Sequence, residues 1–267
     1  MAHPNRWVTQ NVLWCGVLLL AGFGNATKVD LKPATAEAFD RYVHKAEARM
    51  EPGHNPFLWV DASPDRLHKV RDGKVVSAPW SGDGDIDVPD GLIHDWVGAV
   101  FIPGATLDKT LALVEDYNNH KKYYKPEVVD SKLMSHNGDN FKVHLRLLKK
   151  QVITVVLDTD HDVRYTRLSP TRCVARSYST RIAEVENAGK KDEHDLEPGH
   201  DHGFMWRLNS YWRYEERDGG VYVECEAISL TRSVPTGLGW LINPIIHNLP
   251  KDSLAGTLRE TRDAVIF

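Results

Sequence analysis

Residues 203–214, GFMWRLNSYWRY, begin the stretch of sequence that decides the fold. The chain then turns at DGG (218–220), returns through VYVECEAISLTR (221–232) and enters the apolar segment PTGLGWLINPII (235–246). The first and third runs are rich in aromatic and β-branched residues, which favours a β-hairpin. An amphipathic helix is predicted from about Lys251 to the end of the chain. A sheet that ends against one long helix can enclose a pocket, so the pattern favours ligand binding.

The hairpin can be given a register. Gly219 and Gly220 both accept positive φ, which predicts a two-residue turn with Asp218 opposite Val221. This register pairs Arg213 with Glu226 and Tyr211 with Ile228, whereas a three-residue loop would change the pairs. One face then sets large side chains against small ones: Trp206, Leu208, Trp212 and Tyr214 against Val223, Cys225, Ala227 and Ser229. The other face carries Arg207, Arg213, Glu224 and Glu226, which suits either solvent or a charged cross-strand ladder.

The aromatic face of the hairpin and the final helix supply the candidate ligand-binding residues. The helix repeats Leu254, Leu258, Thr261 and Val265, a stripe that would lie across a curved sheet. Residues 238–246 suit a gate over a cavity or an edge that touches a membrane surface transiently, with simple core packing as the alternative. Tyr178 and Ser229 are candidates to orient a ligand. The full candidate set is Trp206, Leu208, Trp212, Tyr214, Tyr178, Ser229, Trp240, Leu241, Ile245, Leu254 and Leu258.

The whole sequence predicts an α+β chain in three parts: a signal peptide at 1–26, an extension at 27–90 and a compact domain at 91–267. The extension consists of a helix at about 34–50, followed mostly by loops. The compact domain begins with a strand, Ile93–Ile102, and a helix over 106–117. Strands follow at 127–136, 141–149, 152–157 and 173–186, with Asn137-Gly138 as a hairpin turn. With the final hairpin, the curved antiparallel sheet has about six to seven strands.

The N-terminus has the layout of a secretory signal peptide. Arg6 precedes an apolar run from Val12 to Phe23, and small residues stand before a cleavage site after Ala26. The run is shorter than the roughly 20 residues that a membrane-spanning helix needs. We therefore expect a periplasmic or secreted protein, with an uncleaved membrane anchor as the alternative. The mature chain keeps Cys173 and Cys225, which suit one disulfide or two buried thiols equally.

Composition and motifs exclude several function classes. A net charge of −4 and a pI of about 6.3 leave no electrostatic footprint for nucleic acid. The His- and Asp-rich run 194–202 lies in a Gly/Pro loop, which favours solvation over metal binding. The DxDxD stretches at 83–87 and 158–162 lack the Gly and Glu of an EF-hand. Nucleophile motifs and phosphate-binding loops are absent as well, so no catalytic residue, metal or cofactor is predicted.

Residues 91–267 resemble the START-like (helix-grip, SRPBCC) superfamily. The resemblance is carried by WVGAVFI (96–102) with the helix after it, by WRLNSYWRYEER (206–217), and by 221–232 leading into PTGLGW (235–240). It implies a sheet that grips the last helix, with a cavity for a hydrophobic small molecule or lipid between them, and it carries over no catalytic residue. An exported, non-catalytic binding or transport protein is the leading hypothesis. The alternatives are a cyclase/aromatase- or hydrolase-like enzyme that uses the same cavity, and an interaction protein whose cavity is closed and whose extension binds a partner.

Overall fold

The computed structural model describes residues 27–50, 56–150, 154–233 and 239–266, and of 239–247 the backbone alone. The expected signal peptide therefore lies outside the described residues. So do the side chains of Trp240, Leu241 and Ile245, and with them the expected gate or membrane-touching edge. Among the described helices, none is both long and apolar enough to cross a bilayer.

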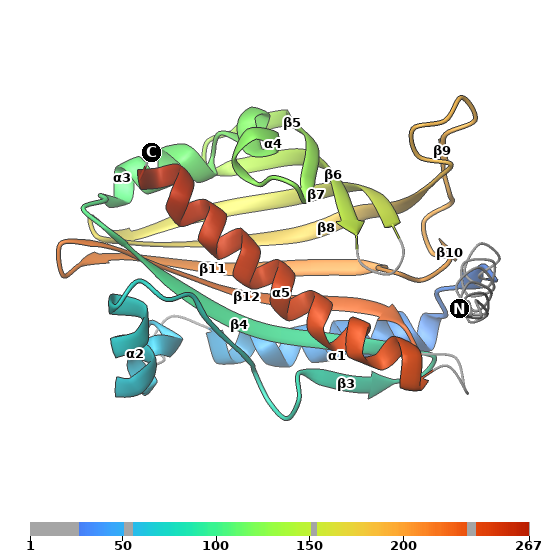
Figure 1. The fold of residues 1–267 in the computed structure, drawn as a ribbon, viewed down its shortest axis with the longest axis horizontal. Helices are drawn as coiled ribbons and strands as arrows, with labels where there is room; N and C mark the ends of the chain where they lie inside the picture. The colour runs from blue at the N-terminus through green and yellow to red at the C-terminus, as the bar shows by residue number, and fades with distance from the viewer. Residues whose placement is uncertain (1–26, 51–55, 151–153, 234–238, 267) are drawn as a thin grey trace, which may run out of the picture.

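A single antiparallel sheet dominates the fold (Figure 1). Its strands run in the order β2-β4-β12-β11-β8-β7-β6-β5, while β3 also pairs with β4 and β9 with β8. The strands are β2 (Val76–Pro79), β3 (Asp85–Val88), β4 (Gly91–Pro103), β5 (Val128–Asn137), β6 (Asn140–Lys150), β7 (Thr154–Ser169), β8 (Arg172–Glu186), β9 (His194–Asp195), β11 (Arg207–Arg217) and β12 (Gly220–Arg232). A separate pair joins β1 (Val29–Asp30) to β10 (His200–Asp201).

The helices occupy both faces of this sheet. They are α1 (Pro33–Met50), η1 (Trp59–Ala62), α2 (Pro64–Arg71), α3 (Leu107–Val114), η2 (Tyr117–Asn119), α4 (His120–Tyr123) and α5 (Gly239–Ile266). Helix α5 crosses the sheet diagonally over β12 and β4, and α1 lies behind the same strands (Figure 1). We call the face under α5 the inner face and the face under α1 the outer face.

The α+β, helix-grip prediction is confirmed, with seven long strands and three short ones in a ten-stranded sheet. The prediction of loops after the first helix is wrong, because the extension adds η1, α2, β2 and β3. Ser63 caps α2 by accepting a hydrogen bond from the Arg66 amide at 3.4 Å, and Pro64 starts the helix. Strands β2 and β3 have four residues each and gain their order from pairing with β4, so local periodicity does not reveal them.

The C-terminal hairpin forms with a register two residues away from the predicted one. Its turn residues are Asp218 and Gly219, with φ of 55° and 76°, and Arg217 pairs with Gly220. Gly220 belongs to the strand, where a Cβ would lie only 2.3 Å from the Ile102 carbonyl oxygen, so this position requires glycine. A shift of two residues leaves every side chain on its predicted face within the paired strands.

The inner face packs against α5. The stripe predicted for the final helix, Leu254, Leu258, Thr261 and Val265, is buried against the sheet. The helix itself begins at Gly239 rather than near Lys251. The helix continues through Pro244 and Pro250, although each lacks the N–H that a helical hydrogen bond needs.

The outer face, predicted to meet solvent or to form a charged ladder, is buried beneath the extension. Glu224 and Glu226 are at most 1% exposed. Arg213 pairs with Glu224 across the strands at 3.3 Å, so the ladder is present, but under cover. Apolar packing joins the two layers, where Phe39 and Ala46 of α1 meet residues of the sheet. The sheet residues in this outer cluster are Ile93, Trp206, Tyr211, Ile228 and Leu230.

A polar cluster ties α1 to the sheet. Arg49 donates to Asp95 at 3.0 Å and also pairs with Glu226, while the Tyr42 hydroxyl donates to Asp95 at 2.7 Å. The Arg49 guanidinium also stacks 3.9 Å from the ring centroid of Trp80. The carboxyl groups of Asp95 and Glu226 both contact the Arg49 guanidinium and are therefore neighbours in this cluster. Burial, followed by the neighbouring Asp95 carboxylate, raises the pKa of Glu226 to about 9.

The two cysteines are free thiols in the inner core. Cys173 pairs with Tyr214 and Cys225 with Trp212, so they flank β11 from opposite sides. Two strand spacings separate them by about 10 Å, beyond the roughly 7 Å between Cα atoms that a disulfide tolerates. The thiol alternative is therefore the correct one.

The buried carboxyl pair predicts a pH-dependent stability. The unfolded chain ionises Glu226 near its ordinary pKa of about 4.5, whereas the folded protein holds the proton up to about 9. The free energy of unfolding should therefore fall as pH rises through this window, by a few kcal/mol in order of magnitude. Glu226→Gln should flatten the profile, as measured by urea denaturation at stepped pH. Parallel profiles for the two proteins would contradict this account.

The packing of α5 predicts opposite effects for two glycine substitutions. A Cβ at Gly98 would lie 2.9 Å from Leu258 Cδ1 and 3.0 Å from the Val76 carbonyl oxygen. Gly98→Ala should therefore destabilise the protein by about 1–3 kcal/mol. A Cβ at Gly256, within α5, meets nothing within 4 Å. Gly256→Ala should stabilise the protein by about 0.5–1 kcal/mol through helix propensity. Thermal denaturation of the two variants measures both effects, and equal shifts of the thermal midpoint would contradict the close contact between Gly98 and Leu258.

Candidate ligand-binding site

The inner face is closed at both ends and partly exposed in its middle. Helix α5 buries the β4 and β12 end, and α3 and α4 pack beside it. Between these regions a set of inward-facing side chains keeps partial exposure. The apolar and small hydroxyl members of this set, called the inner strip below, are Leu145, Ser177, Ser179, Leu208, Ser210, Trp212 and Ala227. Lys149 also faces inward from β6, but its ammonium is paired with Glu127 and Ser253. The composition of the inner strip itself is typical of a site for an apolar ligand.

Two apolar clusters flank the inner strip. On one side Trp96, Tyr214 and Cys225 pack with Leu254 and Leu258 of α5. On the other side, Leu208 contacts a second cluster in which Tyr124 is the aromatic member. The buried residues of that second cluster are Tyr124, Val128, Leu147, Leu157 and Ile182. The strip therefore lies between two packed walls, both built from residues far apart in the sequence.

One buried polar pair borders the strip. The Thr159 hydroxyl donates to the Leu145 carbonyl oxygen at 3.0 Å, and Nε2 of His161 lies 3.0 Å from the same hydroxyl oxygen. Nδ1 of His161 is buried and has no hydrogen-bond partner among the described residues. Burial lowers the pKa of His161 to about 4, so its ring is neutral at pH 7.

Other inward polar groups bond to one another. The hydroxyls of Tyr117 and Tyr165 lie 2.9 Å apart, and Thr261 of α5 donates to the Tyr124 hydroxyl at 3.2 Å. These pairs are internal links of the core. They leave His161 as the buried inner-face side chain with an open acceptor nitrogen in the part of the chain described.

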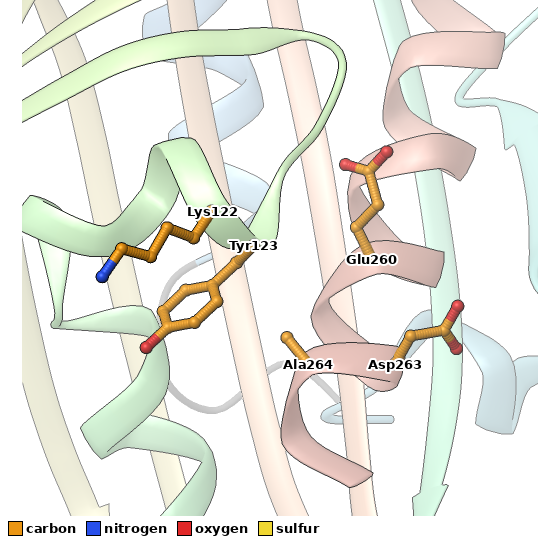
Figure 2. Close-up of a pocket in the computed structure, with 5 residues that line it drawn as sticks. All are labelled: Lys122, Tyr123, Glu260, Asp263 and Ala264. Atoms are coloured by element: carbon orange, nitrogen blue, oxygen red, sulfur yellow. The ribbon is translucent and has the colours of Figure 1, made fainter. Parts of the chain in front are cut away.

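A groove of about 460 Å³ opens between α4 and α5 (Figure 2). Its lining residues are Lys122, Tyr123, Glu260, Asp263 and Ala264. Burial, followed by repulsion from the Glu127 carboxylate, raises the pKa of Glu260 to about 7. Lys149 bridges this region to the sheet, since its ammonium donates to Ser253 at 2.8 Å and pairs with Glu127. The bridge fixes the middle of α5 against β6 and limits access from that side.

Six of the predicted site residues lie on the inner side: Leu208, Trp212, Tyr214, Ser229, Leu254 and Leu258. Leu208 and Trp212 belong to the inner strip, while the other four are buried around it. The side chains of Trp240, Leu241 and Ile245 lie outside the described residues. Ligand contact by the inward residues stays a prediction.

Two of the predicted site residues lie on the wrong side of the sheet. Trp206 packs in the outer cluster and donates from Nε1 to Asp201 at 2.9 Å, because β11 begins only at Arg207 and its alternation does not extend to Trp206. The Tyr178 hydroxyl donates to Glu47 of α1 at 2.6 Å. The prediction that these two line the cavity is therefore wrong.

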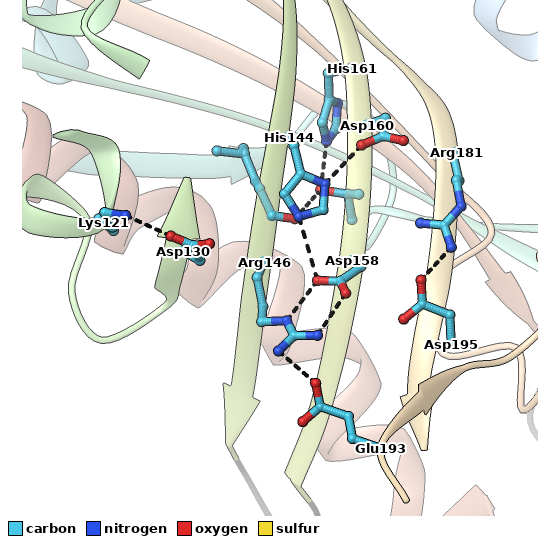
Figure 3. Close-up of polar contacts among 12 residues, drawn as sticks. Lys121, Asp130, His144, Arg146, Asp158, Asp160, His161, Arg181, Glu193 and Asp195 are labelled. Atoms are coloured by element: carbon cyan, nitrogen blue, oxygen red, sulfur yellow. Dashed lines mark hydrogen bonds and ion pairs between the residues drawn. The ribbon is translucent and has the colours of Figure 1, made fainter. Parts of the chain in front are cut away.

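Sequence reasoning missed His161, although a signal for it existed. The DxDxD stretch at 158–162 lies on β7, where successive side chains alternate between faces. Asp158 binds Arg146 at 2.8 Å and Asp160 binds His144 at 2.8 Å, both on the outer face (Figure 3). An outward Asp160 requires an inward His161. The alternation that located the strand could thus have located the histidine.

Metal binding finds little support in the geometry. Within the described ranges, no three His, Cys, Asp or Glu side chains are placed to hold an ion. The histidines of the 194–202 run each meet a different carboxylate: His194 is 3.3 Å from Glu186, His200 is 2.5 Å from Asp30, and His202 is 2.7 Å from Glu184. They therefore do not converge.

The chain has a helix-grip fold, in which an antiparallel sheet packs against a long C-terminal helix, as the resemblance to the START-like superfamily implied. No family model matches it, and no curated protein does. Among solved structures, it is similar to a STAR-related lipid transfer protein fragment from Xanthomonas axonopodis (18% identity, 69% of this chain and 99% of that chain, TM-score 0.47). It is also similar to the Zhui aromatase/cyclase from a Streptomyces species (10% identity, 65% of this chain and 94% of that chain, TM-score 0.42). A third similar structure is a START superfamily protein from Mycobacterium smegmatis (10% identity, 65% of this chain and 97% of that chain, TM-score 0.42).

Proposed function

We propose that this protein binds a hydrophobic small molecule or lipid on the inner strip and carries it without catalysing a reaction. The observation that supports this most directly is the partial exposure of Leu208, Trp212 and Ala227 on a face that is otherwise buried. Covering such side chains with an apolar ligand contributes about 25 cal/mol per Å² of buried apolar surface. The serines of the strip supply hydrogen bonds that orient a ligand without charge.

The chemistry of the inner face favours binding over catalysis. The inner face carries two buried histidines on β4 and β7 that an acid–base enzyme could use. The partner of His161 is Thr159 rather than a carboxylate. Both ring nitrogens of His94 are engaged, Nδ1 at 2.5 Å from Asp85 and Nε2 at 3.1 Å from the Thr231 hydroxyl, and burial lowers the pKa of His94 to about 4 as well. A base whose pKa lies near 4 is a weak proton acceptor at neutral pH, well below the range in which general bases are efficient. A cyclase- or hydrolase-like enzyme would need a better-matched group in this position.

The charged side chains of the extension are bonded to the rest of the same chain, which weighs against a separate role of the extension in recognising a partner. Its charged groups bond to the outer face: Arg49 to Asp95, Arg71 to Asp218, and Glu47 to two tyrosines. A partner would have to displace these contacts. The extension thus supports the site from behind rather than offering a free surface.

Native mass spectrometry tests the carrier proposal directly. Protein purified under mild conditions should carry added mass that organic extraction removes, and the delipidated protein should take up a fluorescent fatty-acid probe. A preparation that is free of ligand and also ignores such probes would exclude the carrier function.

A substitution that fills the inner strip should block uptake. Ala227→Phe places a ring on the strip, where Ala227 lies among partly exposed neighbours, and should lower probe affinity at least tenfold. Thr166→Phe is the matched control, because Thr166 is exposed on the outer side of β7. Equal loss of affinity in both variants, or in neither, would contradict binding at the strip.

We also propose export, supported by Arg6, the apolar run 12–23 and the small residues before position 27. Transient contact of 238–246 with a membrane surface belongs to the same proposal. Intact-mass analysis of protein recovered from the periplasm or medium should show a chain that begins at Thr27. Recovery of that material with Met1 retained would refute cleavage after Ala26.

A further inference from the structure

The buried imidazole of His161 has a defined tautomer. A hydroxyl group carries one proton, and that of Thr159 is donated to the Leu145 carbonyl oxygen at 3.0 Å. The Thr159 oxygen must then accept from His161, whose Nε2 lies 3.0 Å away, so Nε2 carries the hydrogen. In the neutral ring, Nδ1 is consequently a bare acceptor.

This acceptor costs stability unless it finds a donor. A buried polar atom without a partner destabilises a protein by about 1–3 kcal/mol, and most such atoms in native structures are satisfied. Nδ1 of His161 is buried, and no described residue donates to it. A hydrophobic side chain at position 161 would not carry this cost. The unpaired nitrogen therefore points to a functional role for His161.

The position of His161 connects it to the candidate site. Strand register pairs His161 with Ser179 on one side and with Val143 on the other. The Ser179 hydroxyl in turn accepts a hydrogen bond from the Leu208 amide at 3.0 Å. Ser179 and Leu208 both belong to the inner strip, so a ligand lying on the strip passes next to the imidazole.

We propose that Nδ1 of His161 accepts a hydrogen bond from a hydroxyl group of the ligand, and that the protein selects apolar alcohols over the corresponding ethers and carboxylates. The inference rests on the proposed function and names the ligand class for the same site. His161 is 5% exposed, so the hydroxyl reaches the ring after a neighbouring side chain such as Leu145 changes rotamer.

The chemistry of the strip excludes the competing headgroups. An ether or ester oxygen cannot donate to Nδ1. A carboxylate would lose its hydration with no cationic side chain in the inner strip to compensate, and burying an unpaired charge is strongly unfavourable. An ammonium group would meet the same cost, since the strip contains no carboxylate. A neutral hydroxyl satisfies the nitrogen and can bond onward to a serine.

Calorimetric titration with farnesol and farnesyl methyl ether tests the proposal, because the two probes differ chiefly in the donor hydrogen. The wild-type protein should bind farnesol about tenfold more tightly, the factor that corresponds to about 1.4 kcal/mol. His161→Phe should bring the two affinities together by weakening farnesol binding alone. His144→Phe is the matched control on the outer face of β6 and should keep the tenfold preference.

A spectroscopic readout on the wild-type protein keeps the proposal testable if His161→Phe does not fold. Nitrogen-15 NMR of the ring should show the Nε2–H tautomer at pH 7, and farnesol should shift the Nδ1 resonance in the direction of hydrogen-bond acceptance while the methyl ether should not. A charged ring, the Nδ1–H tautomer, or equal shifts with both probes would overturn the assignment.

The outcomes separate this inference from the function on which it rests. Equal binding of both probes, with blockage by Ala227→Phe, would refute the hydroxyl preference and leave the carrier function standing. Failure of both probes and of fatty-acid probes to bind would refute the carrier function and the inference together.

Discussion

The fold depends on burying β4 on both faces at once. Every residue of this strand from Gly91 to Ile102 is buried. Inward, Gly98 lets Leu258 of α5 approach the backbone. Outward, Asp95 needs the partners that α1 brings, Arg49 and Tyr42. A carboxylate inside such a strand is tolerated only if it is paired, so the sheet and the extension form one structural unit.

This double burial also explains where a ligand site can exist. Helix α5 packs its apolar stripe on β4 and β12, and the small helices α3 and α4 pack near its end. The middle of the sheet, around β11 and β8, is left less fully covered, and there Trp212 and the serines keep partial exposure. The site is thus a consequence of the diagonal path of α5, which covers one half of the inner face better than the other.

The sequence predicted much of this arrangement, and its errors have physical causes. The faces of β11 and β12 were correct because alternation survives a shift of two residues. The register was wrong because Asp218-Gly219 and Gly219-Gly220 both suit a two-residue turn, and the protein uses the first pair. Trp206 was misplaced because the regular strand begins one residue after it. The burial of the charged outer face depends on α1, which lies more than 170 residues earlier in the chain. The local sequence pattern of the hairpin does not reveal that this helix covers it.

The two edges of the sheet differ in the features that limit pairing with strands of other chains. On one side, β2 and β3 cap the edge of β4 with four-residue strands, too short to template a long new strand. On the other side, the outermost strand is β5, which exposes Val129 and Met134. Its register breaks twice against β6, between Val128 and Asp130 and between Leu133 and Ser135. Such irregularities interrupt the even row of free N–H and C=O groups on which intermolecular strand addition depends.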